Sequence, residues 1–587
     1  MRGLTHRWVV AQQRPHTHPP GTDALPTRVL CARGIVAPDA ATAFCEPRLT
    51  DLHDPSLLPG VDRAAQRLLD ALKAGEPTVL YGDYDVDGVA ACAILFHVCR
   101  ALSPEAPVTT YVPHRLDEGY GVNGEALERF AADGVRLVVT VDCGVTAVAQ
   151  AALARRLGLD LVISDHHNFA GDPPDLPDAH TLVHPRLPGG SYPFGELCGA
   201  AVAFKIAWRL ATLANGSDRV PDAMRTLLLD MLALAALGTV ADVVPLVGEN
   251  RVIARFGLAR LRSIENEGMR ALIEASGLAS NNVNAEDVGF KLGPRLNACG
   301  RMGHAREAIE LLTVARGARA HEIAGMLTQQ NDKRRAVERA IALQADAMAV
   351  EAGMTTDERR AIVLAHEDWH PGVLGIVCSR LVEKRRRPTI LLQRTGGPGG
   401  RCVGSGRSID GVSLHAAIAE CEDLLEKYGG HDMAAGLALP ESNLAEFVER
   451  VTEAINRRTS VEDLTPLLRI DCDATMDELT PDAVHSLGRL GPFGRENPTP
   501  VIRVPGVRLE GSPQPLGQQA RHLALKGRCN GRVMRFVAWN WGDRREALPA
   551  GSVVDLVVEP KVSAWSTMRT GQPTVEPVIR DVRVLEG

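Results

Sequence analysis

From residue 62 onward, the apolar positions alternate between helical and strand-like spacing. The spacing predicts a helix over 62–74, a strand in PTVLYGDYD and a helix in VAACAILFHVCRAL. Two further helix–strand pairs follow, and their strands are VRLVVTVD and LDLVIS. Strands that alternate with helices at this spacing are typical of βαβ units. We therefore predict an α/β fold in which these strands form a parallel sheet.

The rest of the chain shows three other patterns. Helical spacing over 303–350 predicts one or two long helices, and a second α/β pattern starts at Arg360. After Pro466, short apolar runs separated by Gly and Pro predict a small β barrel. We therefore expect an N-terminal lead-in packed on the next domain, a first α/β domain, a helical connector, a second α/β domain and a barrel, at 1–60, 61–270, 271–355, 356–460 and 461–587.

Composition narrows the class of protein. At 587 residues with 45% hydrophobic and 23% charged residues, the chain suits several folded domains. The longest weakly polar stretch, 227–246, is interrupted by Asp230, Asp242 and Pro245, and we expect no membrane span or signal peptide. The 12 cysteines lack CxxC spacing, which predicts reduced thiols and a cytoplasmic protein. The net charge of −7 argues against a protein that coats nucleic acid indiscriminately.

Three aspartates follow the first predicted strand in GDYDVDG. Asp83, Asp85 and Asp87 alternate, so an extended strand would place their carboxylates on one face. An Asp-rich turn with a helix cap is the alternative. An EF-hand is disfavoured because its twelfth position, a Glu in that motif, is Ile94 here. Three carboxylates this close repel one another unless a cation compensates.

Carboxylates and histidines also follow the next strands. Asp142 ends one strand, Asp165, His166 and His167 end another, and Asp242 lies at a turn in an apolar segment. Taken singly, each is also explained as a helix cap or a core histidine. Together with the first motif they indicate a two-metal centre, and oxygen and imidazole ligands favour Mg²⁺ or Mn²⁺.

The motifs GDYDVDG, VDCG, SDHH and GTVADVVPL, in this order, resemble motifs I to IV of the DHH phosphoesterase superfamily. HPGVLGIVCSRLVEK, GSGRS and YGGHDMAAGLAL resemble the DHH-associated domain of its RecJ branch, and LGPFGRENPTPV resembles the start of that branch's oligonucleotide-binding barrel. The resemblance spans roughly 60–587. It implies a DHH catalytic domain, a DHH-associated substrate-binding domain and an oligonucleotide-binding barrel for the two α/β domains and the barrel predicted above.

The resemblance implies a 5′→3′ exonuclease specific for single-stranded DNA that releases 5′-mononucleotides in recombination and repair. Two Mn²⁺ or Mg²⁺ ions would be held by Asp83, Asp85, Asp87, Asp142, His166 and Asp242. Asp142 would bridge the ions, Asp165 would hold His166 or His167 in one tautomer, and His167 would face the scissile phosphate. Pyrophosphatase members carry a His where this chain has Tyr81, which argues against that branch.

The same reasoning gives a strand-binding set: Arg115, Arg295, Asn297, Arg301, Ser405, Arg407, Ser408, His431, Trp539 and Trp541. The GSGRS stretch would offer backbone N–H groups, hydroxyls and a guanidinium to a terminal phosphate. Residues 380–407 hold eight Lys or Arg against one acid, which agrees with this role. Strand alternation would place Trp539 and Trp541 on one face and Phe536 on the other. Taken singly, each is also explained as a turn or core residue.

Two alternatives stay open. A small-substrate DHH phosphatase or oligoribonuclease is disfavoured because such chains lack the C-terminal barrel. A catalytically inactive single-strand-binding DHH protein would have lost carboxylates that are all present here. The expected partner is single-stranded DNA with a free 5′ end, to which the resemblance adds a single-strand-binding protein and a helicase. No membrane partner is expected.

Overall fold

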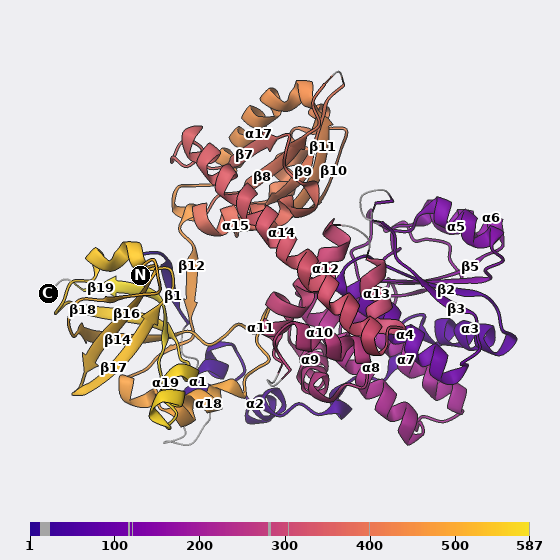
Figure 1. Cartoon of the computed structure of the whole chain (residues 1–587), viewed down its shortest axis with the longest axis horizontal. Coiled ribbons are helices and arrows are strands. Elements are labelled where there is room, and N and C mark those ends of the chain that lie inside the picture. Colours follow the sequence, from indigo (N-terminus) through magenta and orange to yellow (C-terminus); the bar gives the residue numbers. More distant parts are fainter. Residues whose placement is uncertain are drawn as a thin grey trace. The chain divides into compact units, whose positions relative to one another are not determined.

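The computed structural model describes residues 1–11, 24–114, 118–119, 121–279, 283–302, 305–397 and 399–585 (Figure 1). The chain forms two compact units. The first unit comprises residues 46–334 and 491–498, and the second comprises residues 1–45, 335–490 and 499–587. The bounds expected for the five segments stay predictions.

A parallel five-stranded sheet forms the centre of the first unit, as predicted. Its order is β3-β2-β4-β5-β6, with bounds Val108–Tyr111, Thr78–Gly82, Leu137–Val141, Asp160–Ser164 and Thr181–Val183. Both β2 and β4 are buried along their whole length, because helices cover both faces of the sheet. The chain leaves β2 toward β3 and returns on the other side at β4. This change of direction at the carboxyl edge is where open α/β sheets bind ligands.

Helices enclose this sheet in two layers (Figure 1). Helices α3 and α4, at Val61–Ala74 and Val86–Leu102, pack with α7 and α8 in one core, while α5 and α6 pack with the sheet in a second core. The bounds of the other helices in this unit include α5 Gly124–Ala132, α6 Val148–Leu157, α7 Gly199–Asn215, α8 Asp222–Ala241, α9 Gly248–Arg260, α10 Glu267–Ala275, α11 Ala285–Asp287, η4 Val288–Leu292, α12 Gly293–Met302 and α13 Arg306–Thr313.

Helix α8 is long and apolar enough to cross a membrane by composition alone. In this fold, however, 61% of its apolar window is buried. The helix packs on α4, α7 and α9 inside the largest core cluster. Its apolar composition is therefore explained by its place in the core.

The second unit contains the second α/β domain, whose sheet has the order β10-β11-β9-β8-β7. Helix α14, Gly317–Glu351, is the long helix predicted from the sequence, and the division between the units falls within it. The bounds of the other elements are β7 Ile362–His366, α15 Pro371–Arg385, β8 Thr389–Arg394, β9 Arg401–Arg407, α16 Leu414–Ala419, β10 Lys427–His431, β11 Ala434–Pro440 and α17 Leu444–Arg458.

The GSGRS stretch was expected to offer backbone N–H groups to a phosphate, and this part of the expectation is wrong. It lies in β9, which pairs with β8 on one side and β11 on the other. Glycine is needed at Gly404 because a Cβ there would collide with the Leu391 carbonyl oxygen. The backbone N–H groups are used within the sheet, so they are not available to a phosphate.

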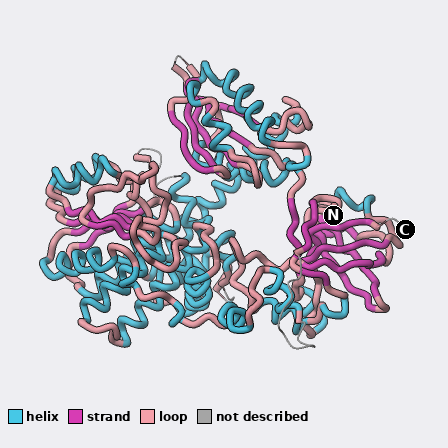
Figure 2. The backbone as a smooth tube through the Cα atoms, turned by 180° about the vertical axis from the view of Figure 1, so that it is seen from behind, coloured by secondary structure: helices cyan, strands magenta, loops and turns pink. Residues whose placement is uncertain are grey.

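Five strands, joined by antiparallel pairings and one parallel pairing, form the predicted barrel (Figure 2). Their order is β14-β18-β19-β17-β16, and β14 pairs again with β16 to complete the ring. The bounds are β14 Ile502–Leu509, β16 His522–Cys529, β17 Arg532–Ala538, β18 Val553–Glu559 and β19 Val578–Val584, with β13 Cys472–Asp473, β15 Gln514–Leu516, α18 Pro481–Gly488 and α19 Ala564–Thr570 attached.

The first residues of the chain belong to the second unit, which also contains the barrel (Figure 2). Strand β1, Arg7–Val10, pairs in parallel with β12, Leu467–Ile470. Trp8 is buried, and its indole Nε1 donates to Asp581 Oδ2 at 2.7 Å. The expectation that the lead-in packs on the next domain is therefore wrong for residues 1–45, which include α1 Leu25–Ala32 and α2 Pro38–Cys45.

Candidate metal centre

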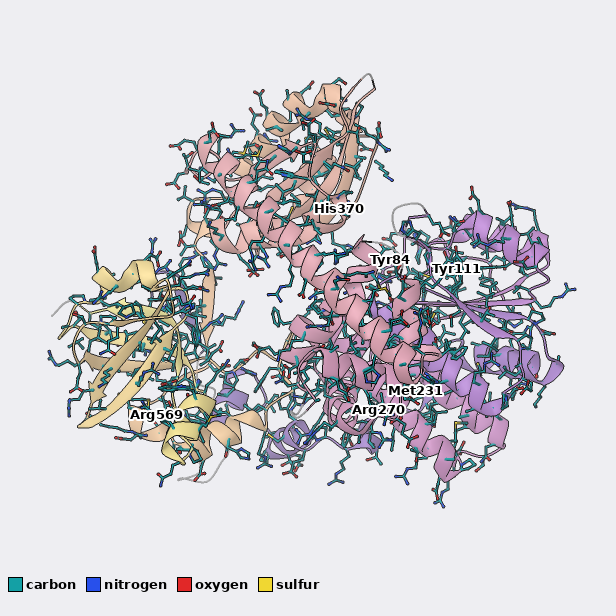
Figure 3. The ribbon with its side chains drawn as sticks, viewed as in Figure 1. Tyr84, Tyr111, Met231, Arg270, His370 and Arg569 are labelled. Atoms are coloured by element: carbon teal, nitrogen blue, oxygen red, sulfur yellow. The ribbon has the colours of Figure 1, made fainter. Side chains whose placement is uncertain are left out.

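The first aspartate motif forms a turn between β2 and α4. Strand β2 ends at Gly82, and Asp85 is the N-cap of α4, accepting hydrogen bonds from Asp87 N at 2.9 Å and Gly88 N at 3.1 Å. The prediction that an extended strand aligns the three carboxylates is therefore wrong. The turn, which contains Tyr84 (Figure 3), is tight because Gly88 has no Cβ; a Cβ there would lie 2.5 Å from Asp83 N.

His166 is the meeting point of the carboxylates. Its Nε2 lies 3.1 Å from Asp142 Oδ1, 3.6 Å from Asp242 Oδ2 and 3.8 Å from Asp87 Oδ2. These residues come from the ends of β5, β4, α8 and the start of α4. Asp142 adopts a left-handed backbone with φ 63°, which Asp tolerates better than most residues. The carboxyl edge of the sheet thus brings together four of the six predicted ligands.

A second group contains the other predicted ligands. One oxygen each of Asp83, Asp85 and Asp142 lie within 4.8 Å of one another, as do ligand atoms of Asp87, His166 and Asp242. Asp142 also lies in a third such group, with His166 and His167. Asp142 therefore connects the first-motif carboxylates to the histidines.

This donor set fits a hard divalent cation. Within the described ranges, Asp142 Oδ1 and His166 Nε2 are buried and make no hydrogen bond, although they lie 3.1 Å apart. Buried polar atoms are normally satisfied, so two such atoms facing each other indicate a missing partner. Carboxylate oxygens with one imidazole are ligands that Mg²⁺ and Mn²⁺ accept.

Electrostatics supports the same conclusion. Burial and the charge of Asp87 raise the pKa of Asp142 well above its ordinary value, and they raise the pKa of Asp85 as well. Burial, followed by the charges of Asp87 and Asp85, raises the pKa of Asp242 to about 8. The fold therefore concentrates carboxylates that resist ionisation in the absence of a cation.

Asp165 fixes the position of His167. Asp165 Oδ1 accepts from the His167 and His166 backbone N–H groups and lies 2.8 Å from His167 Nδ1, while its Oδ2 accepts from Val145 N. Burial lowers the pKa of His167, but the hydrogen bond and charge of Asp165 and the charges of Asp242 and Asp87 together raise it to about 9. Burial raises the pKa of Asp165, yet the hydrogen bond and charge of His167 and the backbone N–H groups together lower it to about 2. Of the two histidines left open by the sequence, His167 is the one that Asp165 orients.

Three contributors were missed by the sequence reasoning. The N-terminus of α7 holds Asp87, since Gly199 N and Ala200 N donate to its two oxygens at 2.6 and 2.9 Å. Arg495 lowers the pKa of Asp242, although burial and the aspartates dominate. A glycine at the first helical position, after a Cys198 N-cap, was the available signal for the α7 contact. Arg495 gave no local signal because 491–498 lies far along the chain.

The strand-binding candidates of the first unit differ in their positions and contacts. Arg115 lies outside the described residues. Asn297 Oδ1 accepts from Val86 N at 3.1 Å, so Asn297 holds the start of α4. Arg295, on the same helix α12, donates to the Lys291 carbonyl at 2.7 Å and to Thr328 Oγ1 at 3.2 Å. Arg301 is half-buried near the end of α12.

In the second unit, Arg407 and His431 lie on β9 and β10. Arg407 donates to the Gly406 carbonyl at 2.7 Å, and His431 is exposed. Ser405 is half-buried on β9, and its carbonyl accepts from Cys378 Sγ. Ser408 is buried and donates its hydroxyl to the Val412 carbonyl at 2.6 Å, which gives this hydroxyl an internal role.

The two tryptophans after β17 do not share a face, contrary to the prediction. The strand ends at Ala538, and Asn540 adopts φ 60°, so the alternation stops. Trp539 is 53% exposed and contacts His522 edge-on, whereas Trp541 is buried. Phe536 is also buried.

Comparison with known proteins agrees with the site and the fold. Residues 77–239 match the DHH family N-terminal domain, 358–457 match the DHHA1 domain and 470–576 match the RecJ OB domain. The single-stranded-DNA-specific exonuclease RecJ of Bacillus subtilis is 36% identical over 558 residues, which cover 95% of this chain and 68% of that protein.

Two further similarities come from Thermus thermophilus. Its single-stranded-DNA-specific exonuclease RecJ is 36% identical over 86% of this chain and 71% of the relative. The crystal structure of RecJ in complex with Mn²⁺ from the same organism superposes with a TM-score of 0.81 at 30% identity, covering 99% of this chain and 80% of that one. A second crystal structure of that protein is in complex with Mg²⁺. With this agreement of motifs and fold, the chain belongs to the RecJ family of single-stranded-DNA-specific exonucleases.

Proposed function

We propose that this protein is a metal-dependent 5′→3′ exonuclease that hydrolyses single-stranded DNA to 5′-mononucleotides. The observation that carries the proposal is that Asp142 belongs both to the aspartate group and to the group with His166 and His167. Two ions would be held by Asp83, Asp85, Asp87, Asp142, His166 and Asp242. When bound, such a pair supplies an activated water and neutralises charge on the phosphate.

His167 acts beside this centre as an electrostatic stabiliser. Burial lowers its pKa, but the hydrogen bond and charge of Asp165, with the charges of Asp242 and Asp87, together raise it to about 9, which favours the protonated ring. Asp165 lies 2.8 Å from its Nδ1 and so orients the ring, and His167 would act by donating a hydrogen bond to a phosphate oxygen. Asp165 is therefore a positioning residue, and His167 is the group that contacts the substrate.

Binding of the strand uses side chains rather than backbone in the second α/β domain. We infer that Ser405 and Arg407 contact the terminal phosphate, with His431 beside them, and that Arg115, Arg295 and Arg301 contact the strand in the first unit. Trp539 is an exposed aromatic of the barrel that can stack on a base. Ser408 and Trp541 are left out because both are buried, and Asn297 because it holds α4.

The biological setting follows from the family alone. Recombination and repair, a cytoplasmic location, and cooperation with a single-strand-binding protein and a helicase are part of this proposal.

The decisive test is digestion of single strands blocked at either end. Degradation of the 3′-blocked strand together with survival of the 5′-blocked strand is the expected result. Survival of both would favour the inactive strand-binding alternative, and digestion of mono- or dinucleotide substrates alone would favour the small-substrate phosphatase.

Loss of the Arg407 guanidinium is expected to reduce discrimination between 5′ ends. A charge-assisted contact to phosphate contributes roughly 1.5–3 kcal/mol, so Arg407→Ala should lower the preference for 5′-phosphorylated over 5′-hydroxyl strands by about tenfold to a hundredfold. The measurement is kcat/KM on both strands at one salt concentration, with Arg545→Ala, at an exposed arginine of the second unit, as a control. A preference unchanged in Arg407→Ala would place the terminal phosphate elsewhere.

The pH dependence of metal binding follows from Asp242. The pKa of Asp242 is raised from 3.8 to about 8 in the metal-free fold. Between about pH 4 and pH 8, the folded state therefore keeps a proton on Asp242 that the unfolded state has lost. Stability of the metal-free protein should therefore fall as pH rises through this window. Mg²⁺ must displace that proton, which weakens its binding by up to about tenfold per pH unit below 8.

The rise in melting temperature caused by Mg²⁺ is thus expected to be larger at about pH 8 than at about pH 6. Differential scanning fluorimetry with and without Mg²⁺ measures this directly. In Asp242→Asn the difference between the two pH values should shrink. An Mg²⁺ effect that is equal at both pH values in the wild type would contradict the role given to Asp242.

A further inference from the structure

An exposed apolar side chain lies directly beside the metal centre. Val243 follows Asp242 at the end of α8, is 59% exposed and has φ 58°. A β-branched residue rarely adopts this left-handed conformation, and such strain persists only where the surrounding structure holds it. The backbone thus presents an isopropyl group to solvent next to a predicted ligand.

A second exposed apolar group lies on the adjoining element. Within the described part of the first unit, Phe290 is the most exposed large hydrophobic residue, at 79%. It lies in the π-helix η4 between Val288 and Leu292, which are both fully buried. The two buried residues fix the inner face of η4, so the phenyl ring is held on the outer face.

Helix packing places Phe290 near the metal ligands. Element η4 packs against α8 and continues into α12. A Cβ at Gly293 would lie 3.8 Å from the Cβ of Ala241, the residue before Asp242. Further along α12, Asn297 bonds Val86 N in the first aspartate motif. The segment that carries Phe290 therefore borders the centre on two sides.

The position of the ring favours a strand as its occupant. Lys291 is exposed and pairs with Asp287 at 2.8 Å, and Arg295 follows one turn later, with its guanidinium held by the Lys291 carbonyl and Thr328. An exposed phenyl ring contributes little to the core, whereas an aromatic face is a surface on which unpaired bases stack without sequence preference. The packing of this segment on α8 and its contact with the first aspartate motif favour a bound single strand over an apolar protein segment as its occupant.

We propose that Phe290 is a stacking platform for one base of the bound single strand, on the segment that borders the metal centre. The identity of this ligand rests on the proposed function, while the platform itself is defined by burial and packing. Phe290 acts on the affinity for the strand and on its position, and it does not take part in hydrolysis.

The test compares Phe290→Ala, Phe290→Tyr and the control Val314→Ala, which truncates another exposed residue of the same unit at 58% exposure. Affinity for a 3′-labelled single strand is measured by fluorescence anisotropy without divalent ions, using intact strands and strands with one abasic residue at successive positions. Hydrolysis of the same strands is measured with Mg²⁺. Melting temperatures of all three variants should match the wild type.

Phe290→Ala is expected to bind the intact strand about five- to 150-fold more weakly, the range that one stacked base contributes. Phe290→Tyr should bind like the wild type because it keeps the ring. At one position, an abasic residue should lower the affinity of the wild type for the strand. The same abasic residue should not lower the affinity of Phe290→Ala any further, since both changes remove the same contact. In hydrolysis, KM should change more than the rate at saturation.

Intact-strand affinity that is the same in Phe290→Ala and the wild type would overturn the proposal and leave a protein partner as the occupant of the ring. Additive losses at every abasic position would also overturn it. If the wild type bound strands but did not hydrolyse them, the proposed exonuclease function would fail, and the binding data would still decide the platform.

Discussion

Asp142→Asn is expected to abolish hydrolysis while leaving single-strand affinity within about threefold of wild type. Asp142 connects the two groups of predicted ligands, so the loss of its charge removes the shared position rather than one site. A drop of at least about a thousandfold in kcat is expected, which corresponds to roughly 4 kcal/mol of lost stabilisation. Asn is preferred to Ala because Asp142 has φ 63°, a conformation that Asn adopts readily.

A second readout separates this role from a folding defect. Removing one of several mutually repelling buried carboxylates should raise the melting temperature of the metal-free protein and abolish its further rise with Mg²⁺. Asp178→Ala is a matched control, because Asp178 is exposed and pairs with exposed Arg155, an interaction of small energy. Turnover of Asp142→Asn within tenfold of wild type would refute the two-metal assignment.

Gly199→Ala is expected to cost at least about a hundredfold in kcat/KM at limiting Mg²⁺, or about 2.7 kcal/mol. A Cβ at this first residue of α7 would lie 2.5 Å from Asp142 Cβ and from its Oδ1. The same residue donates its N–H to Asp87. The added methyl group would therefore displace both a shared ligand and the helix end that holds another.

The control is Gly325→Ala, in α14, where a Cβ would meet nothing within 4 Å. Ala is a better helix former than Gly, so this control should gain about 0.5–1 kcal/mol in stability with unchanged activity. Isothermal titration of Mg²⁺ with each variant gives the direct comparison. Wild-type Mg²⁺ affinity in Gly199→Ala would show that the carboxylates do not depend on this close approach.

Local patterns predicted most of the architecture and the gathering of the candidate ligands at one edge of the sheet. Alternating helix and strand spacing is sufficient to identify βαβ units, and in a parallel sheet the carboxyl ends of neighbouring strands must meet, which brings Asp142 and His166 together. The shape of the first motif was not predictable in this way. Aspartates two residues apart fit a strand and a strand–turn–helix equally, and the choice depends on how closely Gly88 approaches Asp83.

Tertiary pairing explains the other differences. Gly and Ser around Ser405 favour a loop by local chemistry, but strands on both sides hold the stretch extended. The alternation that grouped the tryptophans ends at Asn540, where the backbone turns. Contacts such as that of Arg495 with Asp242 join segments more than 250 residues apart, and no local periodicity reports them.

The pairing of β1 with β12 has a consequence for synthesis of the chain. Arg7 pairs with Leu467, so β1 lacks its neighbour until about 460 further residues have been translated. At about 5–20 residues per second, that interval is roughly half a minute to a minute and a half. During this time Trp8 and the unpaired edge of β1 have no native cover on the nascent chain, and they are a surface that a ribosome-associated chaperone would protect.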